Sequence, residues 1–341
     1  MKIGVVGASG YSGGELLRLL LKHPDFEIEY IAAGSQAGSS ISSVHPQLAP
    51  LAGQNFVATD VRRMNNCDLI FFALPHGESD RFIAEINSEI KVVDLGADFR
   101  LESAEAWEKY YGGIHAGAWV YGLPEIPGQR AKIASSSRVA NPGCYATAIA
   151  LAAAPALAAD LIESDDLVVV AASGTTGAGR KASVALLASE VMGSLTSYKF
   201  GGVHQHTPEI EQTLSKLSQS PVKISFTPIL APMPRGILAT VTSKLNKDAT
   251  TDEVRDLYQS FYAHDEFVNL LPDSLLPKTS SVIGSNSVLL QVAVDRHVNR
   301  LVISAVIDNL GKGAASQAIQ NANLMFGLLE GAGLSTSGIG S

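Results

Sequence analysis

The sequence predicts an α/β protein, with a parallel, doubly wound sheet first and an α+β part on a mixed or largely antiparallel sheet after it. Up to about residue 140, short apolar segments alternate with helical patterns, which is typical of βαβ units. From residue 167 onward, strand-like segments dominate. At 341 residues, 46% of them apolar, the chain is long enough for two domains with sizeable cores.

The elements expected in the first part are short. We expect strands over 1–7, 26–33, 67–74 and 91–95, and helices over 15–22 and 78–86. Because residues 1–7 run directly into glycines, they indicate a strand and no signal sequence.

The second part begins with an Ala-rich helix over 147–159. Strands are expected over 167–172, 222–226, 237–244, 287–294 and 300–307. An amphipathic helix over 313–329 is expected to return to the first domain, and the Gly/Ser-rich tail is expected to be loose. We therefore expect a dinucleotide-binding domain over 1–143, a catalytic and oligomerisation domain over 144–309, and this helix with its tail over 310–341.

Charge and cysteine content narrow the class of partner. The net charge is −8 and no Lys/Arg run occurs, so we expect neither a nucleic-acid nor a membrane partner, and a small-molecule substrate instead. No apolar run reaches the roughly 18 residues of a membrane span. The two cysteines, Cys67 and Cys144, cannot form a disulfide framework, which favours a reducing, cytoplasmic location.

Cys144 is the candidate nucleophile. With Asn141 as helix N-cap and Pro142 as first helical residue, Cys144 is predicted at the third helical position. Unpaired backbone N–H groups and the helix dipole favour an anion there, and a thiolate is one. A small buried hydrophobe at a helix start is the competing interpretation.

A glycine segment near the start has the spacing G-x-x-G-x-x-G between a strand and a helix. In that position glycines let a backbone approach a pyrophosphate, so we expect cofactor contacts there; the alternative is a tight turn without a ligand. The expected contacts are Gly7, Ser9, Gly10, Tyr11, Ser12 and Gly13. Ser35 and Gln36 follow the second strand where an acidic residue would favour NAD, so the cofactor is predicted to be NADP.

Two further loops are expected at the cofactor. Small residues after the strand over 167–172 would allow a nicotinamide or a phosphate to approach, although a bare Gly-rich turn has the same composition. The expected contacts are Ser173, Gly174, Gly177, Gly179, and Pro75 with His76 at the end of a first-domain strand. Arg180 follows the second glycine loop and is a candidate cation for the substrate.

His204 and His206 are candidates for a general acid/base. Thr207 as N-cap and Pro208 as first residue predict a helix directly after them. Zinc is the alternative, but no further ligands stand at metal-site spacing, so we expect no metal. A histidine partner for a thiolate is favoured because its pKa lies near working pH.

Arginine would hold a substrate carboxylate through two parallel hydrogen bonds. Arg100 is the first candidate because it follows the carboxyl end of a strand, although a surface salt bridge is an equal alternative. Arg235 is the second.

Several segments together resemble the N-acetyl-gamma-glutamyl-phosphate reductases. The segments are Gly7-x-x-Gly10-x-x-Gly13, 94–100 (DLGADFR), 121–125 (YGLPE), 141–147 (NPGCYAT), 173–179 (SGTTGAG) and 204–210 (HQHTPEI). The resemblance runs from residue 1 to about 313, and the segments around Cys144 and His204 are its most specific parts. It implies a relative of aspartate-semialdehyde dehydrogenase with a Rossmann domain, NADPH as reductant, and a homodimer or homotetramer.

The resemblance further implies that Cys144 is the nucleophile and His204 the acid/base. Asn141 and His206 are expected to bind the substrate. The expected reaction is NADPH-dependent reduction of N-acetyl-glutamyl 5-phosphate through a cysteine thioester, in arginine biosynthesis. Reductases of aspartyl phosphate or of a carrier-linked aminoadipyl phosphate are alternatives within enzymes. A non-catalytic dinucleotide sensor is the alternative outside them.

Overall fold

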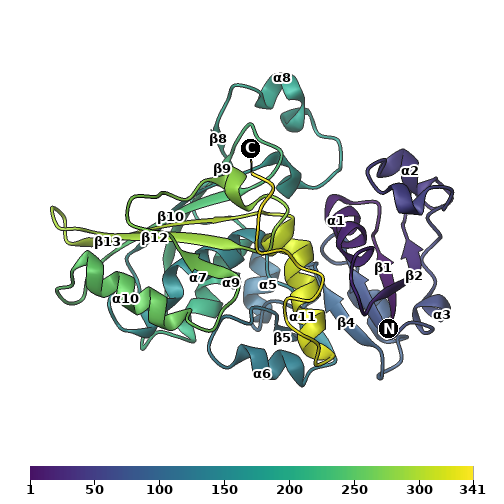
Figure 1. Cartoon of the computed structure of the whole chain (residues 1–341), viewed down its shortest axis with the longest axis horizontal. Coiled ribbons are helices and arrows are strands. Elements are labelled where there is room, and N and C mark those ends of the chain that lie inside the picture. Colours follow the sequence, from purple (N-terminus) through teal and green to yellow (C-terminus); the bar gives the residue numbers. More distant parts are fainter. Residues whose placement is uncertain (341) are drawn as a thin grey trace. The chain divides into compact units, whose positions relative to one another are not determined.

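The computed structural model describes residues 1–340, which divide into two compact units (Figure 1). The first unit comprises Met1–Pro142 and Ala314–Leu334, and the second comprises Gly143–Gly313 and the residues from Ser335. The second unit is thus inserted into the chain of the first. Among residues 1–340, no helix is long and apolar enough to cross a membrane.

The first unit is built on a six-stranded sheet in which all strands are parallel, as predicted. Its order is β2-β1-β3-β4-β6-β5. The strands are β1 (Lys2–Val6), β2 (Glu27–Ala32), β3 (Leu69–Phe72), β4 (Lys91–Asp94), β5 (Val120–Tyr121) and β6 (Arg138–Ala140). Because parallel strands end at one edge, the segments after β1, β2 and β3 lie close together.

The first unit also contains helices, several of which pack on this sheet. They are α1 (Tyr11–Leu20), α2 (Ile41–Val44), η1 (Ala49–Leu51), α3 (Val61–Met64), α4 (Asp80–Ile83), α5 (Ala104–Tyr110), α6 (Gln129–Ala134) and α11 (Ser316–Met325). Helix α1 buries Leu16, Leu17, Leu19 and Leu20, the apolar face that its sequence predicts. Helix α11 packs on the same core through side chains such as Ile319.

The second unit is built on a seven-stranded mixed sheet, as predicted, in the order β11-β12-β13-β10-β7-β9-β8. The strands are β7 (Leu167–Ser173), β8 (Thr196–Ser197), β9 (Ile224–Leu230), β10 (Ile237–Lys244), β11 (Val268–Leu270), β12 (Val288–Asp295) and β13 (Arg300–Ile307). Within this second sheet, as far as residues 1–340 describe it, the β7–β9 and β11–β12 pairings are parallel and the others are antiparallel.

Three longer helices pack against this sheet: α7 (Cys144–Ala158), α9 (His206–Ser215) and α10 (Thr251–Phe261) (Figure 1). Short turns are η2 (Thr175–Ala178), η3 (Val184–Leu186), α8 (Ala188–Val191) and η4 (Thr279–Val282). Nearly every residue of α7 is buried, which explains why this helix is apolar all round. On strand β7, Val168 and Val170 stay 39% and 43% exposed.

Three expectations about element ends are wrong. Helix α7 begins at Cys144 with Gly143 as N-cap, so Cys144 is the first helical residue. Helix α9 begins at His206 with Gln205 as N-cap, so Thr207 does not cap it. The expected helix over 78–86 is reduced to α4, because the amides of Gly77 and Ser79 are held by Asp98.

The C-terminal segment also differs from the prediction. A π-helical turn, η5 (Gly311–Ala315), precedes α11, and α11 ends at Met325. The expectation of a loose tail is wrong for residues 335–339, which are hydrogen-bonded within the second unit, and residue 341 lies outside the described residues. Asn286 N–H donates to the Ser335 carbonyl at 2.8 Å, and Ile339 N–H donates to the Ile283 carbonyl at 2.9 Å.

Candidate active site

Cys144 lies half-buried at the N-terminus of α7. Gly143 has extended backbone and supplies no side-chain cap, so the first-turn amides around Cys144 are not occupied by a capping side chain. The Gly143 N–H donates to Oε1 of the fully buried Glu209 at 2.8 Å. This bond ties the start of α7 to α9, the helix that follows the two histidines.

His204 is buried in an aromatic cluster within the same unit. Its ring centroid lies 5.4 Å from that of Tyr145, 5.8 Å from that of Tyr198, 5.1 Å from that of Phe226 and 4.9 Å from that of His206. Burial, reinforced by His206, lowers the pKa of His204 to about 2. The imidazole is therefore neutral at ordinary pH.

One hydrogen bond indicates the tautomer of His204. The His206 N–H donates to Nδ1 of His204 at 3.0 Å. Because Nδ1 accepts this bond, the proton of the neutral ring is placed on Nε2. His204 can thus donate a hydrogen bond from Nε2 without first being charged.

Two tyrosines complete the cluster, and the sequence did not identify them as site residues. The Tyr198 hydroxyl donates to the Tyr145 hydroxyl at 3.1 Å, and Tyr145 donates to the Ile229 carbonyl at 3.3 Å. Burial raises the pKa of Tyr198 to about 12 and raises that of Tyr145 as well. Both phenols therefore stay protonated. Tyr145 follows the nucleophile in sequence, which was the only signal for it.

Gly313 packs against the nucleophile. A Cβ atom at this position would lie 2.7 Å from Cβ of Cys144 and 3.2 Å from its Cα. The Gly313 N–H donates to the Asp308 carbonyl at 2.9 Å, which fixes the π-helical turn. Only glycine fits this approach without displacing Cys144.

Arg235 is committed to a carboxylate of its own chain. Its Nε lies 3.0 Å from Oδ1 of Asp308 and its Nη2 lies 2.5 Å from Oδ2, an arrangement with two parallel bonds. Asn309 next to it accepts from Gly236 N–H at 2.7 Å and donates to Oγ1 of Thr176 at 3.0 Å. The guanidinium group of Arg235 thus binds Asp308, and the residue helps to fix the second glycine loop.

The second glycine loop is closely packed where it leaves β7. A Cβ on Gly174 would lie 2.7 Å from the backbone nitrogen of Arg235. Ser173 is buried, whereas Gly177, Gly179 and Arg180 are exposed. The loop can therefore present backbone to a ligand at its outer end.

In the first unit, the β1–α1 loop has the shape of a phosphate cradle. Gly7 has φ +85°, and a Cβ there would lie 2.3 Å from the Ala73 carbonyl oxygen; one on Gly13 would lie 2.6 Å from Cα of Ala8. A Cβ on Gly10 would lie 3.5 Å from the Gly7 carbonyl oxygen, an ordinary contact, and Gly10 gives α1 no side-chain cap. The residues present therefore fit a dinucleotide whose pyrophosphate lies at the N-terminus of α1.

The other predicted cofactor residues of this unit follow neighbouring strands. Ser35 and Gln36 come after β2 and are exposed, and residues 33–38 contain no carboxylate. Pro75 and His76 follow β3 and are exposed, with His76 5.2 Å edge-on from Tyr111. Ser173, Gly174, Gly177 and Gly179 belong to the second unit, so the predicted cofactor residues are divided between the units.

Arg100 and Asn141 are brought together in the first unit. Nε of the buried Arg100 donates to the Asn141 carbonyl at 2.8 Å, and Nη2 donates to the Leu95 carbonyl at 2.8 Å. Asn321 of α11 donates to Oδ1 of Asn141 at 3.1 Å. Arg100 is therefore not a surface salt-bridge residue; it holds the segment that leads to Cys144.

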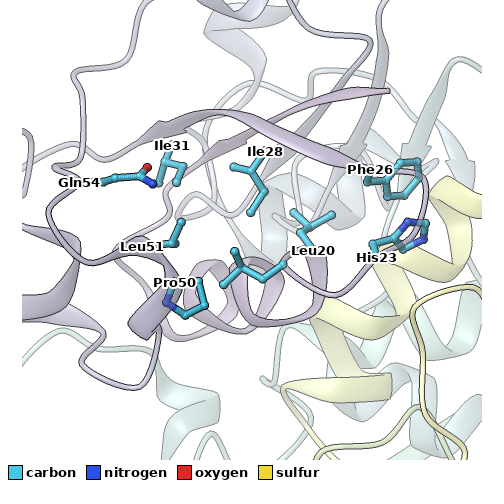
Figure 2. Close-up of a pocket in the computed structure, with 9 residues that line it drawn as sticks. Leu20, His23, Phe26, Ile28, Ile31, Pro50, Leu51 and Gln54 are labelled. Atoms are coloured by element: carbon cyan, nitrogen blue, oxygen red, sulfur yellow. The ribbon is translucent and has the colours of Figure 1, made fainter.

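A separate cavity of about 290 Å³ lies in the first unit, away from these groups (Figure 2). Figure 2 shows Leu20, Ile28 and Pro50 around it, with Gln54 at one end and His23 at the other. Apart from His23 and Gln54, the residues that line it are apolar, and they include neither cysteine nor carboxylate. Among residues 1–340, no three or more His, Cys, Asp or Glu side chains are grouped to hold a metal ion.

Comparison with known proteins agrees with this organisation. Residues 2–136 match the family described as semialdehyde dehydrogenase, NAD binding domain, and residues 144–309 match its dimerisation domain. Solved structures of aspartate semialdehyde dehydrogenase II from Vibrio cholerae (TM-score 0.72, 17% identity, 95% of this chain and 98% of that one) and of the Francisella tularensis enzyme (0.71, 14%, 96% and 100%) share the fold.

Much closer relatives are named N-acetyl-gamma-glutamyl-phosphate reductase. The protein from Acidothermus cellulolyticus is 55% identical over 338 residues, 99% of this chain and 98% of that one. Those from Frankia casuarinae and Thermobifida fusca are 52% and 51% identical over 99% and 98% of this chain, and 98% of each relative. At this identity over the full length, the chain belongs to the N-acetyl-gamma-glutamyl-phosphate reductase family of semialdehyde dehydrogenases.

Proposed function

We infer that the chain reduces N-acetyl-glutamyl 5-phosphate to N-acetyl-glutamate 5-semialdehyde and phosphate, with NADPH, in arginine biosynthesis. The family supplies the reaction, because its members carry this activity in their name. The observation that carries the inference to this chain is a half-buried cysteine at a helix N-terminus in the same unit as a buried, neutral histidine.

Cys144 would act as the nucleophile. Its sulfur attacks the acyl carbon, the bond to the phosphate oxygen breaks, and a thioester forms as phosphate leaves. Amides at the start of α7 would stabilise the oxyanion, at roughly 3–4 kcal/mol for each donor. The Glu209 contact to Gly143 would keep this helix start in place.

His204 would act as the acid/base group, with a hydrogen bond from its neutral ring as its contribution to the tetrahedral states. With its hydrogen on Nε2, the neutral imidazole can donate to the oxygen that becomes negative in the tetrahedral states. Tyr145, Tyr198 and Phe226 enclose the ring and exclude water from it. His206 supplies the backbone bond that orients the ring, and we propose that its side chain contacts the substrate.

NADPH, when bound, supplies the hydride that reduces the thioester. We propose that the β1–α1 loop, from Gly7 through Ser9 and Tyr11 to Gly13, holds its pyrophosphate. Ser35 and Gln36 would bind the 2′-phosphate, since no carboxylate follows β2 to repel it. Pro75, His76 and the 173–179 loop are proposed as further contacts.

The substrate residues remain proposals of different weight. Arg180 is exposed, and we propose that it contacts an anionic group of the substrate. Arg100 and Arg235 already bind Asn141 and Asp308, so a substrate carboxylate would have to share these arginines with partners from the chain itself. Asn141 is proposed to act mainly by fixing the backbone before Cys144.

We propose a homodimer or homotetramer in the cytoplasm. The matched dimerisation domain supports self-association, and one face of the second sheet is available for it. Val168 and Val170 of β7 are exposed there, and Thr240 of β10 pairs with Val170 in register. We also retain the functional division into 1–143, 144–309 and 310–341.

A single assay tests the reaction: phosphate-dependent reduction of NADP and of NAD with N-acetylglutamate semialdehyde, beside aspartate semialdehyde. Cys144→Ala should abolish turnover and leave NADPH binding intact, because the nucleophile is needed for chemistry alone. Cys67→Ala is the matched control. Burial raises the pKa of the Cys67 thiol to about 11, so Cys67 is not a thiolate and its replacement should barely alter the rate. Because Cys67 is buried, Cys67→Ala should lower the stability. Equal rate losses in both variants would contradict the covalent mechanism.

A further inference from the structure

Lys199 stands beside the His204 cluster in a strained backbone conformation. Its φ is +42°, and the glycines that follow, Gly201 and Gly202, have φ +83° and +79°. A lysine in this left-handed region is strained, and such residues cluster where ligands bind. The strained turn over 199–202 thus places the Lys199 side chain against Gln205.

Tyr198 and Lys199 contact the histidine segment through two consecutive residues, His204 and Gln205. The Tyr198 ring lies 5.8 Å from that of His204, and Nζ of Lys199 donates to Oε1 of Gln205, the residue after His204. The ammonium group is therefore held on the same short segment as the proposed proton donor.

Lys199 is exposed and binds the neutral side chain of Gln205, and this combination distinguishes it from two other cations of the second unit. Arg235 is bound by both oxygens of Asp308, and Lys312 is fully buried, 5.7 Å from the Phe267 ring centroid. Lys199 is exposed, yet partial burial of its ammonium lowers its pKa. Its positive charge also contributes to the lowered pKa of His204.

We propose that Lys199 binds an anionic oxygen group of the acyl phosphate, either the phosphate or the α-carboxylate. This inference rests on the proposed function, because that substrate brings both groups to the nucleophile. Gln205 occupies one of the three ammonium donors, so donors remain for an oxyanion, to which lysine acts as a point charge.

The reverse reaction, in which the semialdehyde is oxidised and phosphorylated, distinguishes the two anions. Inorganic phosphate and the semialdehyde, which carries the α-carboxylate, are then separate substrates with separate KM values. In Lys199→Gln, the KM of one of them should rise about 10- to 100-fold, the usual worth of a charged hydrogen bond. A rise for phosphate identifies the phosphate, and a rise for the semialdehyde identifies the carboxylate. Lys199→Arg should restore most of the affinity. Lys223→Gln, an exposed lysine of the same unit, should leave both KM values unchanged.

Alkylation of Cys144 provides a readout that needs no substrate. Lys199→Gln should lower the rate with the anionic reagent iodoacetate relative to that with neutral iodoacetamide, because the attracting charge is gone. If wild type does not turn over the semialdehyde, the proposed function fails, and the alkylation ratio decides on Lys199 by itself. Unchanged KM values in an active Lys199→Gln variant, or an unchanged alkylation ratio, would overturn the proposal.

Discussion

His204 illustrates how one hydrogen bond selects a residue's chemistry. The His206 amide occupies Nδ1, so only Nε2–H is available for proton donation. We expect His204→Asn to lower kcat by roughly 10²- to 10⁴-fold, since general acid catalysis is lost. His206→Asn keeps the backbone amide and should act mainly on KM. Steady-state kinetics of both variants separate the roles; a His204→Asn enzyme with normal kcat would sink the assignment.

The close contact between Gly313 and Cys144 leads to a second prediction. In Gly313→Ala, the new methyl group would overlap Cβ of Cys144 at 2.7 Å, so the nucleophile must move. A displacement of this kind should cost about 10²-fold in kcat with little change in the KM for NADPH.

Gly53→Ala is the matched control for this change. Gly53 has positive φ (+82°), so alanine is strained there, but it has no neighbour within 4 Å of a Cβ; Gly53→Ala should therefore lose stability alone. If kcat of Gly313→Ala equals that of Gly53→Ala, the contact does not position Cys144.

Residue identities were predictable where local chemistry marks them, whereas their partners were not. A Pro-Gly-Cys segment before an Ala-rich stretch places Cys144 near a helix start. The segment does not reveal that the Asn141 side chain donates to the Ala314 carbonyl at 3.2 Å, a contact across 173 positions. Asn141 is therefore not the N-cap of α7 that the sequence predicts. Glu209 belongs to the 204–210 segment, one of the most specific parts of the sequence. Its hydrogen bond to Gly143 could still not be predicted, because it depends on tertiary packing.

At the scale of elements, the end of β4 carries a buried carboxyl pair. Oδ1 of Asp94 accepts from the Ser79 hydroxyl at 2.8 Å and from Gly96 N–H at 3.1 Å, while its buried Oδ2 has no partner. Asp98 accepts from the amides of Gly77 and Ser79. The two carboxyls thereby hold the turn after β3 against β4.

This arrangement makes stability depend on pH in a defined direction. Burial, with the charge of Asp98 opposing that of Arg100, raises the pKa of Asp94 from 3.8 to about 7. The folded state therefore favours the protonated form, and this contribution to stability is lost as pH rises from about 4 through 7.

Asp94→Asn should remove that loss, because Asn keeps the acceptor for Ser79 and cannot ionise. We expect its melting temperature to exceed that of wild type by a few degrees, about 2–4 °C per kcal/mol, at pH 8 and by less at pH 5. Differential scanning calorimetry at both pH values measures this, and a Tm difference independent of pH would contradict it.

Elements with a strong local pattern were predictable, and those that depend on distant contacts were not. The expected strands over 237–244 and 300–307 coincide with β10 and β13, because alternating burial on one sheet face imposes period two. Helix α10 was missed although its sequence contains a capping box, Thr250 with Glu253. The end of α11 depends on Asn323 bonding the Glu330 and Ala332 carbonyls, which no local pattern announces.

For the whole molecule, the exposed face of the second sheet should govern self-association. Val170→Glu places a charge beside Thr240 on that face and should dissociate the oligomer, as measured by size-exclusion chromatography with light scattering. Ile114→Glu, at a 90% exposed apolar residue of the first unit, is the control. Unchanged mass for Val170→Glu would exclude this face, and a monomeric wild type would exclude self-association.

The interrupted chain of the first unit has a consequence for how the protein is made. Ala318, Ile319 and Ala322 of α11 belong to the core that α1 and β1 form, so this core is incomplete until the ribosome has passed residue 325. The inserted unit, whose strands all precede residue 308, emerges earlier. Nascent chains therefore complete the sheet that follows Cys144 while the Rossmann sheet still awaits its last helix, reversing the usual N-terminal-first order of synthesis-coupled folding.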